Sequence, residues 1–176
     1  MKAVYRNSLR SKKLMQDAMI ALLKKKPLSE ISVTDLVKKA DINRGTFYNH
    51  YNNPIDIIEE MKDELVEKLS SGLNEVSKTG DVTLLLDAIS EHVKKNENDY
   101  RIIVKAIPTS FVDNMKTQII TQVKTFPVKT NPFTLYFIVN AIAGLYLDYL
   151  KGLLPFTFDQ MTAECKKIII SLTFEE

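Results

Sequence analysis

Apolar residues recur every three or four positions along almost the whole chain, as they do at Leu14, Ala18, Ala21 and Leu22. No stretch alternates between apolar and polar residues over the length of a strand. A period of three to four residues buries one face of an α-helix, whereas strict alternation buries one face of a strand. The pattern therefore predicts an all-α protein.

Residues that cap helix N-termini mark four of the predicted starts. Ser32 with Asp35, and Thr157 with Gln160, have the spacing of a capping box, while Asn53 and Asn131 each precede a proline. These side chains accept hydrogen bonds from the first free amides of a helix, and proline is favoured at its first position. With the apolar spacing they predict about nine helices, at residues 8–26, 33–40, 44–51, 54–74, 82–96, 98–107, 110–125, 132–153 and 158–173.

The helices predicted at 33–40 and 44–51 are short and lie close together in the sequence, whereas most of those downstream are long. Charge changes at the same place. Residues 1–51 carry eleven Lys/Arg and four Asp/Glu, a net +7, and residues 52–176 carry thirteen and eighteen, a net −5. We therefore expect an N-terminal domain at 1–52 and a helical domain at 53–176. A basic first domain favours contact with a polyanion, although a solvated lysine-rich face has the same composition.

The apolar run at 134–154 is nearly long enough to span a membrane. It is interrupted by Asn140, Asp148 and Lys151, and its flanks lack an aromatic and basic anchor pattern. We expect a central helix, covered on one side by its own domain and on another by a partner, and no membrane contact. The first residues lack the apolar core of an export signal, and Cys165 is the single cysteine, so we expect a cytoplasmic protein.

The sequence contains no set of residues typical of an enzyme active site. His50 and His92 are the two histidines, and neither follows a glutamate by three residues, as di-iron bundles require. Cys165 has no second cysteine for a zinc site, and the five glycines form no phosphate-binding loop. We expect no catalytic residues, no metal and no cofactor.

The segment at 31–51 has the pattern of two short helices around a tight turn. Its expected inward face consists of Leu36, Val37, Ala40, Ile42, Phe47 and Tyr51. Asp41 can take the left-handed conformation after a helix end, and Asn43 can cap the next helix. This is the arrangement of a helix-turn-helix, whose second helix enters the DNA major groove. An ordinary helical hairpin has the same spacing, so that alternative stays open here.

The outward residues of the second helix suit DNA. Arg44 can bind guanine O6 and N7 together, Gly45 allows close backbone approach, and Thr46 can meet a thymine methyl or a phosphate. The residues that we expect to contact DNA, or to position those that do, are Thr34, Asn43, Arg44, Gly45, Thr46, Tyr48, Asn49 and His50. Lysines 24–26, 38 and 39 would add a field that is independent of DNA sequence.

At the same residues the chain resembles the tetracycline-repressor (TetR) family of bacterial transcriptional regulators. The residues that carry the resemblance are Ala40, Ile42, Gly45, Thr46, Phe47, Tyr48, His50 and Tyr51, and Leu14, Ala18, Leu22, Ile31 and Thr34 agree with the family's preceding helices. Val37 stands where alanine is usual, Asp41 where the turn glycine is usual, and Pro54 where many relatives have a phosphate-contacting lysine. We still expect the turn to form.

The resemblance implies that the C-terminal domain is regulatory and that its last two helices form a homodimer. A two-fold dimer would read a pseudo-palindromic DNA operator through two half-sites. The residues expected at this interface are Ala141, Gly144, Asp148, Ile168 and Leu172, and Cys165 and Ile169 extend the apolar stripe of the last helix. Tight packing inside the monomer is an equal alternative for Ala141 and Gly144.

The resemblance also implies a repressor whose DNA affinity falls when a small molecule binds among the middle helices. Polar residues on otherwise apolar helices are candidates for that site, namely Tyr100, Asn114, Gln118, Gln122, Tyr136 and Asn140. Solvent exposure or partners within the core explain the same residues. The alternative is a DNA-binding regulator, even an activator, that is controlled by a protein co-regulator docking on the C-terminal domain.

Overall fold

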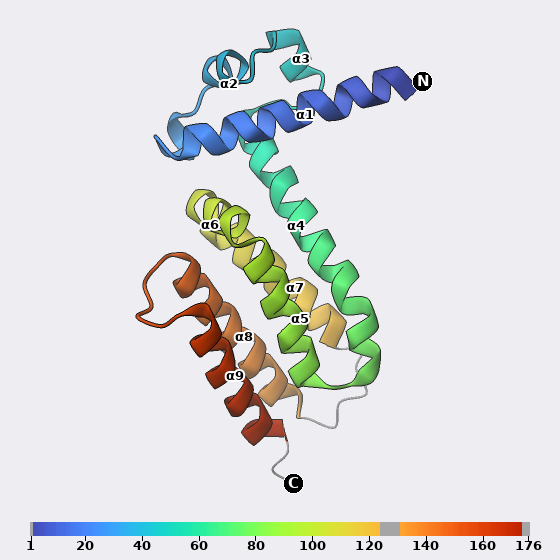
Figure 1. The fold of residues 1–176 in the computed structure, drawn as a ribbon, viewed down its shortest axis with the longest axis vertical. Coiled ribbons are helices and arrows are strands. Elements are labelled where there is room, and N and C mark those ends of the chain that lie inside the picture. The colour runs from blue at the N-terminus through green and yellow to red at the C-terminus, as the bar shows by residue number, and fades with distance from the viewer. Residues whose placement is uncertain (1, 124–130, 174–176) are drawn as a thin grey trace. The chain divides into compact units, whose positions relative to one another are not determined.

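The computed structural model describes residues 2–123 and 131–173, with the side chains of residues 2–6, 75, 77, 108–110, 122, 123 and 173 outside the description (Figure 1). This part of the chain contains nine α-helices, two 3-10 helices and no strand, which confirms the predicted all-α class. The helices are α1 (Lys2–Leu23), α2 (Val33–Ala40), α3 (Arg44–Tyr48), α4 (Pro54–Val76), α5 (Val82–Lys95), α6 (Glu97–Ala106), α7 (Pro108–Val123), α8 (Pro132–Leu150) and α9 (Phe158–Thr173), with 3-10 turns at Leu28–Glu30 and Ser77–Thr79.

The chain divides into two compact units, Met1–Glu64 and Leu65–Glu176. Helix α4 begins in the first unit and ends in the second. The predicted division into a DNA-binding domain at 1–52 and a regulatory domain at 53–176 stays a prediction.

In the first unit, α1 packs against α2, and α2 packs against α3 (Figure 1). The core is formed by Met15, Met19, Leu36 and Phe47, all fully buried. Of the residues that show the helical spacing of α1, Ala18 is buried, whereas Leu14 is 38% exposed. The buried face of α1 follows Met15, Met19 and Leu23 instead, because both registers satisfy the helical period and only packing selects one.

In the second unit, α8 packs against α6, α7 and α9, and α5 packs against α6 and α9. Its fully buried side chains include Leu69, Leu73, Tyr100, Ile103 and Val104. Figure 1 shows α8 and α9 side by side. The unit therefore has an extended apolar core shared by helices that lie far apart in the sequence.

The predicted caps form. Asn53 Oδ1 accepts hydrogen bonds from the amides of Ile55 and Asp56, and Asn131 Oδ1 accepts one from Phe133. The capping boxes at Ser32 and Thr157 are both closed. These bonds use amides that have no partner inside the helix, which is why local sequence predicts helix starts well.

Helix ends differ more from prediction. Helix α8 ends at Leu150 rather than 153, because Gly152 takes a left-handed φ of 74°. The amide of Leu153 then donates to the carbonyl of Asp148, which closes a Schellman motif. Helix α1 ends at Leu23, shortly before Pro27, and α3 ends at Tyr48.

Helix α8 is long and apolar enough to cross a membrane by length and composition, and 22% of its most apolar window is buried. Its exposed apolar residues include Phe133, 77% exposed, and Phe137, 56% exposed. The expectation of a helix covered by its own domain on one side is consistent with the buried Ile138, Val139 and Tyr146. The opposite side has no cover within the described chain.

Candidate nucleic-acid interface

Local hydrogen bonds build the turn between α2 and α3. Asp41 follows α2 with φ 53° and ψ 51°, the left-handed conformation that its residue type predicts. Its amide and that of Ile42 both donate to the carbonyl of Val37. Asn43 Oδ1 then accepts the amide of Thr46 at 2.7 Å and starts α3. The turn therefore forms with aspartate where glycine was usual.

Aromatic packing holds the second helix against the first. Phe47 is fully buried and Tyr51 is 5% exposed, with their ring centroids 6.0 Å apart. Leu36 and Ala40 of α2 are also buried, whereas Val37 and Ile42 are half-buried. Phe47 therefore anchors this five-residue helix from its inner side, while Arg44, Gly45 and Tyr48 are exposed.

Most of the residues predicted for DNA contact lie at the surface. Thr34, Asn43, Arg44, Gly45 and Asn49 are exposed. Tyr48 is 54% exposed, with the edge of its ring against Phe47. Thr46 and His50 are half-buried. A Cβ placed at Gly45 would lie 3.2 Å from Asn43 Oδ1, so glycine there leaves room for the side chain that caps α3.

The structure brings together the two helices' predicted contact residues. Arg44 Nη2 donates a hydrogen bond to Thr34 Oγ1 at 2.6 Å, linking the first turn of α3 to the first turn of α2. Both side chains are exposed, so the pair forms a polar contact at the surface. A guanidinium held this way keeps further N–H donors for another acceptor, because arginine carries five.

A three-residue network behind α3 was not predicted from the sequence. The Tyr51 hydroxyl and the Lys12 ammonium both donate to the Glu60 carboxylate, joining α1, the segment between α3 and α4, and α4 itself. Burial and the bond to Glu60 raise the pKa of Tyr51, so its phenol is neutral at pH 7. Burial raises the pKa of Glu60, but the bonds from Lys12 and Tyr51 outweigh this, and the net pKa is lowered. In the sequence, Lys12 and Glu60 show only the helical spacing of polar residues, and polar residues exposed to solvent have the same spacing.

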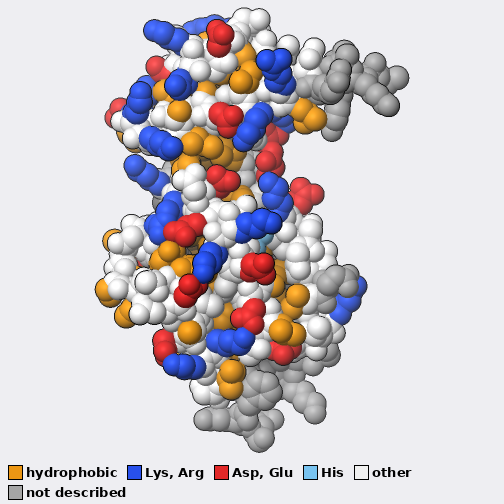
Figure 2. Space-filling view, in the orientation of Figure 1, with side chains coloured by type: hydrophobic (Ala, Val, Ile, Leu, Met, Phe, Trp, Pro, Cys, Tyr) orange, Lys and Arg blue, Asp and Glu red, His pale blue; other side chains and the backbone are white. Residues whose placement is uncertain are grey.

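Basic residues surround the helix-turn-helix. Lysines 24, 25, 38 and 39 are exposed, and Figure 2 shows Lys and Arg side chains spread over the visible face of the N-terminal unit, with Asp and Glu side chains among them. Lys26 is an exception, because its ammonium lies 2.8 Å from Asp35 Oδ2. The bonds from Lys26 and Ser32 strongly lower the pKa of Asp35. The Lys26 ammonium therefore balances the charge of the Asp35 carboxylate in the first turn of α2.

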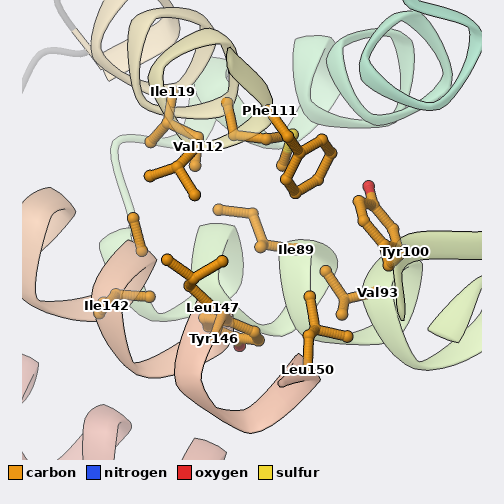
Figure 3. Close-up of a pocket in the computed structure, with 12 residues that line it drawn as sticks. Ile89, Val93, Tyr100, Phe111, Val112, Ile119, Ile142, Tyr146, Leu147 and Leu150 are labelled. Carbon is orange, nitrogen blue, oxygen red and sulfur yellow. The ribbon is translucent and has the colours of Figure 1, made fainter. Parts of the chain in front are cut away.

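The predicted effector-site residues are dispersed in the second unit. Tyr100 is fully buried and lines an apolar cavity. Asn114 is half-buried, Gln118 Oε1 accepts from Ser70, and Asn140 Nδ2 donates to the carbonyl of Tyr136. Tyr136 is 44% exposed. Of the predicted residues other than Tyr100, neither this cavity (Figure 3) nor a second apolar cavity between α5, α7, α8 and α9 is lined by Asn114, Gln118, Tyr136 or Asn140. The Gln122 side chain lies outside the described residues.

The predicted dimer residues lie on the open side of the last two helices. Ala141 is exposed, and Gly144 and Asp148 are half-buried. Ile168 is 53% and Leu172 41% exposed. Cys165 and Ile169 face the core instead, so the predicted apolar stripe of α9 separates into an inner and an outer row. Within the described residues, no group of three or more His, Cys, Asp or Glu side chains is placed to hold a metal ion.

No family model matches the chain. An uncharacterized HTH-type transcriptional regulator of Bacillus subtilis strain 168, YxbF, is 30% identical over 59 residues. That match covers 34% of this chain and 16% of the length of that relative.

Solved structures match over nearly the whole chain. A TetR transcriptional regulator from Streptococcus agalactiae 2603V has a TM-score of 0.67 at 18% identity, covering 96% of this chain and 98% of its own. The dihydroxyacetone kinase operon activator DhaS has a TM-score of 0.62 at 15% identity, over 93% and 96%. The TetR family repressor AlkX from Dietzia sp. strain DQ12-45-1b has a TM-score of 0.57 at 17% identity, over 91% and 93%. The chain therefore has the fold of TetR-family regulators, and the predicted resemblance is confirmed.

Proposed function

We propose that this chain, which has the TetR fold, is a transcriptional regulator that binds a specific double-stranded DNA sequence. The observation that carries the proposal is the geometry of α3. Its one large apolar residue, Phe47, is fully buried, and Arg44 stands exposed at its first turn. The first residues of a recognition helix are the ones that reach base edges in the major groove. On this proposal the protein acts in the cytoplasm, at the nucleoid, and is not an enzyme.

The proposed division of labour follows from residue chemistry. Arg44 binds a guanine edge in each half-site, while Thr46 and Asn49 contact neighbouring bases. Tyr48, His50 and Thr34 contact phosphates and set the register, and Asn43 and Gly45 shape the start of α3. Exposed lysines such as Lys38 add attraction to any duplex, and this part of the affinity falls as salt rises.

We further propose that the protein acts as a homodimer through α8 and α9. Phe133, Phe137, Ala141, Gly144 and Asp148 recur at helical spacing along α8, and none of them is buried. Apart from the nearby backbone of α8 itself and the two adjacent residues, a Cβ built at Gly144 would meet no described atom within 4 Å, which weakens the alternative of tight packing inside the monomer. Ile168 and Leu172 form the matching outer row of α9. A two-fold dimer would place two recognition helices on a pseudo-palindromic operator.

Two modes of control remain candidates. In the first, the protein is a repressor whose DNA affinity falls when a small molecule binds the second unit. The apolar cavity at Tyr100 supports this mode. In the second, a protein co-regulator docks on the C-terminal unit and the chain is an activator. The uncovered apolar side of α8, and the description of a similarly folded protein as an operon activator, support that mode.

The experiment is a comparison of two variants that each remove one positive charge. Fluorescence anisotropy measures binding to DNA selected from genomic fragments, and to a shuffled duplex, across a salt series. We expect Arg44→Ala to lose about 1–3 kcal/mol of discrimination between the two duplexes. Lys38→Ala should weaken both duplexes equally and lower the slope of log K against log salt by about one.

The same data test the proposal against its failure. Wild-type protein that binds every duplex with equal affinity would contradict specific recognition. Equal loss of affinity for both duplexes in Arg44→Ala would contradict the role of Arg44. Circular dichroism spectra of both variants check that the helices are intact.

A further inference from the structure

One side-chain hydrogen bond joins the first turn of α2 to the first turn of α3. Arg44 Nη2 donates to Thr34 Oγ1 at 2.6 Å, although the two residues are ten positions apart in the chain. The two helices pack against each other, as Figure 1 shows, and each buries a large apolar side chain, Leu36 of α2 and Phe47 of α3. The bond therefore attaches a long, exposed side chain to a fixed point on the neighbouring helix.

The acceptor in this bond is neutral, and the carboxylate next to it in the sequence is already occupied. Asp35 accepts hydrogen bonds from Lys26 Nζ at 2.8 Å and from the hydroxyl and the amide of Ser32 at 2.7 and 2.9 Å. Among the described residues Arg44 forms no ion pair, and Thr34 Oγ1 is the one side-chain acceptor that its guanidinium contacts. Arg44 is therefore held in place while no protein carboxylate balances its positive charge.

A neutral acceptor suits an arginine that has to bind an anion. Bonds between a guanidinium and a carboxylate are strong, so a carboxylate in the place of Thr34 would compete with DNA for Arg44. A hydroxyl forms a weaker bond and leaves the charge available. Arginine carries five N–H donors, of which guanine O6 and N7 take two. One bond to Thr34 is therefore compatible with a two-bond contact to the base.

The Thr34 hydroxyl can also act as a donor. Its oxygen accepts from Arg44, and its own proton has no acceptor among the described residues. Thr34 is exposed, so this proton can be donated to a DNA phosphate, which is the contact proposed above for Thr34. Two hydrogen bonds then run in one direction, from the guanidinium to the hydroxyl and from the hydroxyl to the phosphate. Each bond in such a chain polarises and strengthens the other.

We propose that Thr34 is the positioning residue for Arg44: it fixes the direction of the guanidinium toward the base edge and couples that contact to a phosphate contact of α2. The inference rests on the proposed function and deepens it, because it assigns the residue that makes Arg44 selective. Without the Thr34 hydroxyl, the Arg44 side chain samples other rotamers and pairs with phosphates of any sequence. Its removal therefore lowers the affinity for the specific duplex more than the affinity for a shuffled one.

The experiment measures discrimination, defined as the ratio of the affinities for the genomic fragment that the wild type selects and for its shuffled duplex. Fluorescence anisotropy at one salt concentration gives both affinities. Thr34→Val removes the acceptor at nearly constant shape and should lower discrimination about threefold to tenfold, the range expected for the loss of one hydrogen bond. Thr34→Ala removes the same acceptor and should have the same effect. Thr34→Ser keeps the hydroxyl and should retain the discrimination of the wild type.

A double-mutant cycle tests whether Thr34 acts through Arg44. Arg44→Ala protein has no guanidinium to hold, so the further change Thr34→Val should leave its discrimination unchanged. A loss as large in Arg44→Ala as in the wild type would show that Thr34 selects DNA directly and would overturn the inference. Thr117→Val is the matched control, because Thr117 is an exposed threonine of the second unit whose hydroxyl donates to the carbonyl of Asp113. This control should bind both duplexes as the wild type does.

Modified DNA identifies the base contact that Thr34 controls. Replacement of a half-site guanine by 7-deazaguanine removes the N7 acceptor. The guanine that Arg44 reads is the one whose replacement weakens binding by the wild type but not by Arg44→Ala. Replacement of that guanine should cost Thr34→Val a smaller factor in affinity than it costs the wild type, because the guanidinium is no longer directed at N7. An equal factor in the two proteins would contradict the positioning role.

Urea unfolding without DNA separates positioning from folding. Thr34 is exposed, so the unfolding midpoints of Thr34→Val, Thr34→Ala and Thr34→Ser should lie close to that of the wild type. Discrimination that falls only in step with stability, in Thr34→Ser as in the other two variants, would assign Thr34 a structural role and refute the proposal.

The outcomes distinguish this inference from the function on which it rests. Specific binding by the wild type, with full discrimination in folded Thr34→Val and Thr34→Ala, overturns the inference and leaves the proposed function standing. Wild-type protein that binds every duplex equally overturns the proposed function and the inference with it. Discrimination that is lost without the hydroxyl, kept in Thr34→Ser and independent of Thr34 once Arg44 is absent supports both.

Discussion

Removal of the Tyr100 hydroxyl should stabilise the free protein. Tyr100 is fully buried, and its ring lies edge-on to His92 and Phe111, with centroid distances of 5.8 and 5.5 Å. Phenylalanine keeps both ring contacts. The hydroxyl that it loses has no partner among the described residues. A buried hydroxyl without a hydrogen bond costs about 1–3 kcal/mol in proteins, so Tyr100→Phe should gain about 1 kcal/mol or more.

Tyr146→Phe provides a matched variant with the opposite sign. Tyr146 lines the same cavity, is 7% exposed, and its hydroxyl is hydrogen-bonded to Ser90. Loss of that bond should lower stability by about 0.5–1.5 kcal/mol. Ser90 Oγ also donates to the carbonyl of Leu86, which limits the loss. Burial raises the pKa of both tyrosines, so both phenols are neutral at pH 7 and charge does not enter the comparison.

The assay is urea unfolding at pH 7, followed by circular dichroism at a helix band. A change in the transition midpoint at constant slope reports stability. Thermal scans should show a rise for Tyr100→Phe and a fall for Tyr146→Phe, each about 2–4 °C per kcal/mol for a chain of this size. If Tyr100→Phe loses as much stability as Tyr146→Phe, the Tyr100 hydroxyl has a partner and the reasoning about an unpaired buried hydroxyl is wrong.

Three further outcomes can be measured on the same protein. In urea unfolding, Asp41→Ala should be about 1 kcal/mol less stable than Asp41→Gly, because a φ of 53° is strained for alanine and unstrained for glycine. Equal stabilities of the two variants would contradict the left-handed turn. Burial and the nearby Lys68 lower the pKa of His92, so stability should be full above about pH 6.5 and fall as the pH drops below that value. In His92→Gln the melting temperature should therefore change less between pH 7 and pH 5 than it does in the wild type. Because the pKa of Glu60 is lowered in the folded protein, its contribution to stability is present above the usual carboxyl pKa and is lost as the pH falls through the folded value. If the stability of Glu60→Gln changes with acid pH as much as that of the wild type, the bonds from Tyr51 and Lys12 contribute nothing to stability.

The amino-acid sequence determined the features whose causes lie within a few residues. Helix starts at Ser32, Asn43, Asn53 and Asn131 follow from a side chain that caps amides two or three positions away. The left-handed turn at Asp41 is equally local, because it depends on the residue type and on the end of α2. The all-α class and the helix-turn-helix were therefore predictable before any contact between distant segments was known.

Tertiary structure alone decided which of several allowed faces is buried. On α1 the pattern allows both Leu14 and Met15 to point inward, and packing against α2 selects Met15. On α9 the apolar residues divide into buried Cys165 and Ile169 and exposed Ile168. Period-three and period-four spacings cover more than one side of a helix, so sequence leaves this choice open.

The same holds for polar groups whose partners come from other helices. Tyr51, Glu60 and Lys12 meet because three segments converge, and Arg44 reaches Thr34 across the turn. Tyr100 and Tyr146 are both tyrosines on apolar helices, yet Ser90 of α5 satisfies one hydroxyl and no described residue satisfies the other. A residue's type states which bonds it can make, but only the packing of distant helices decides which bonds it has.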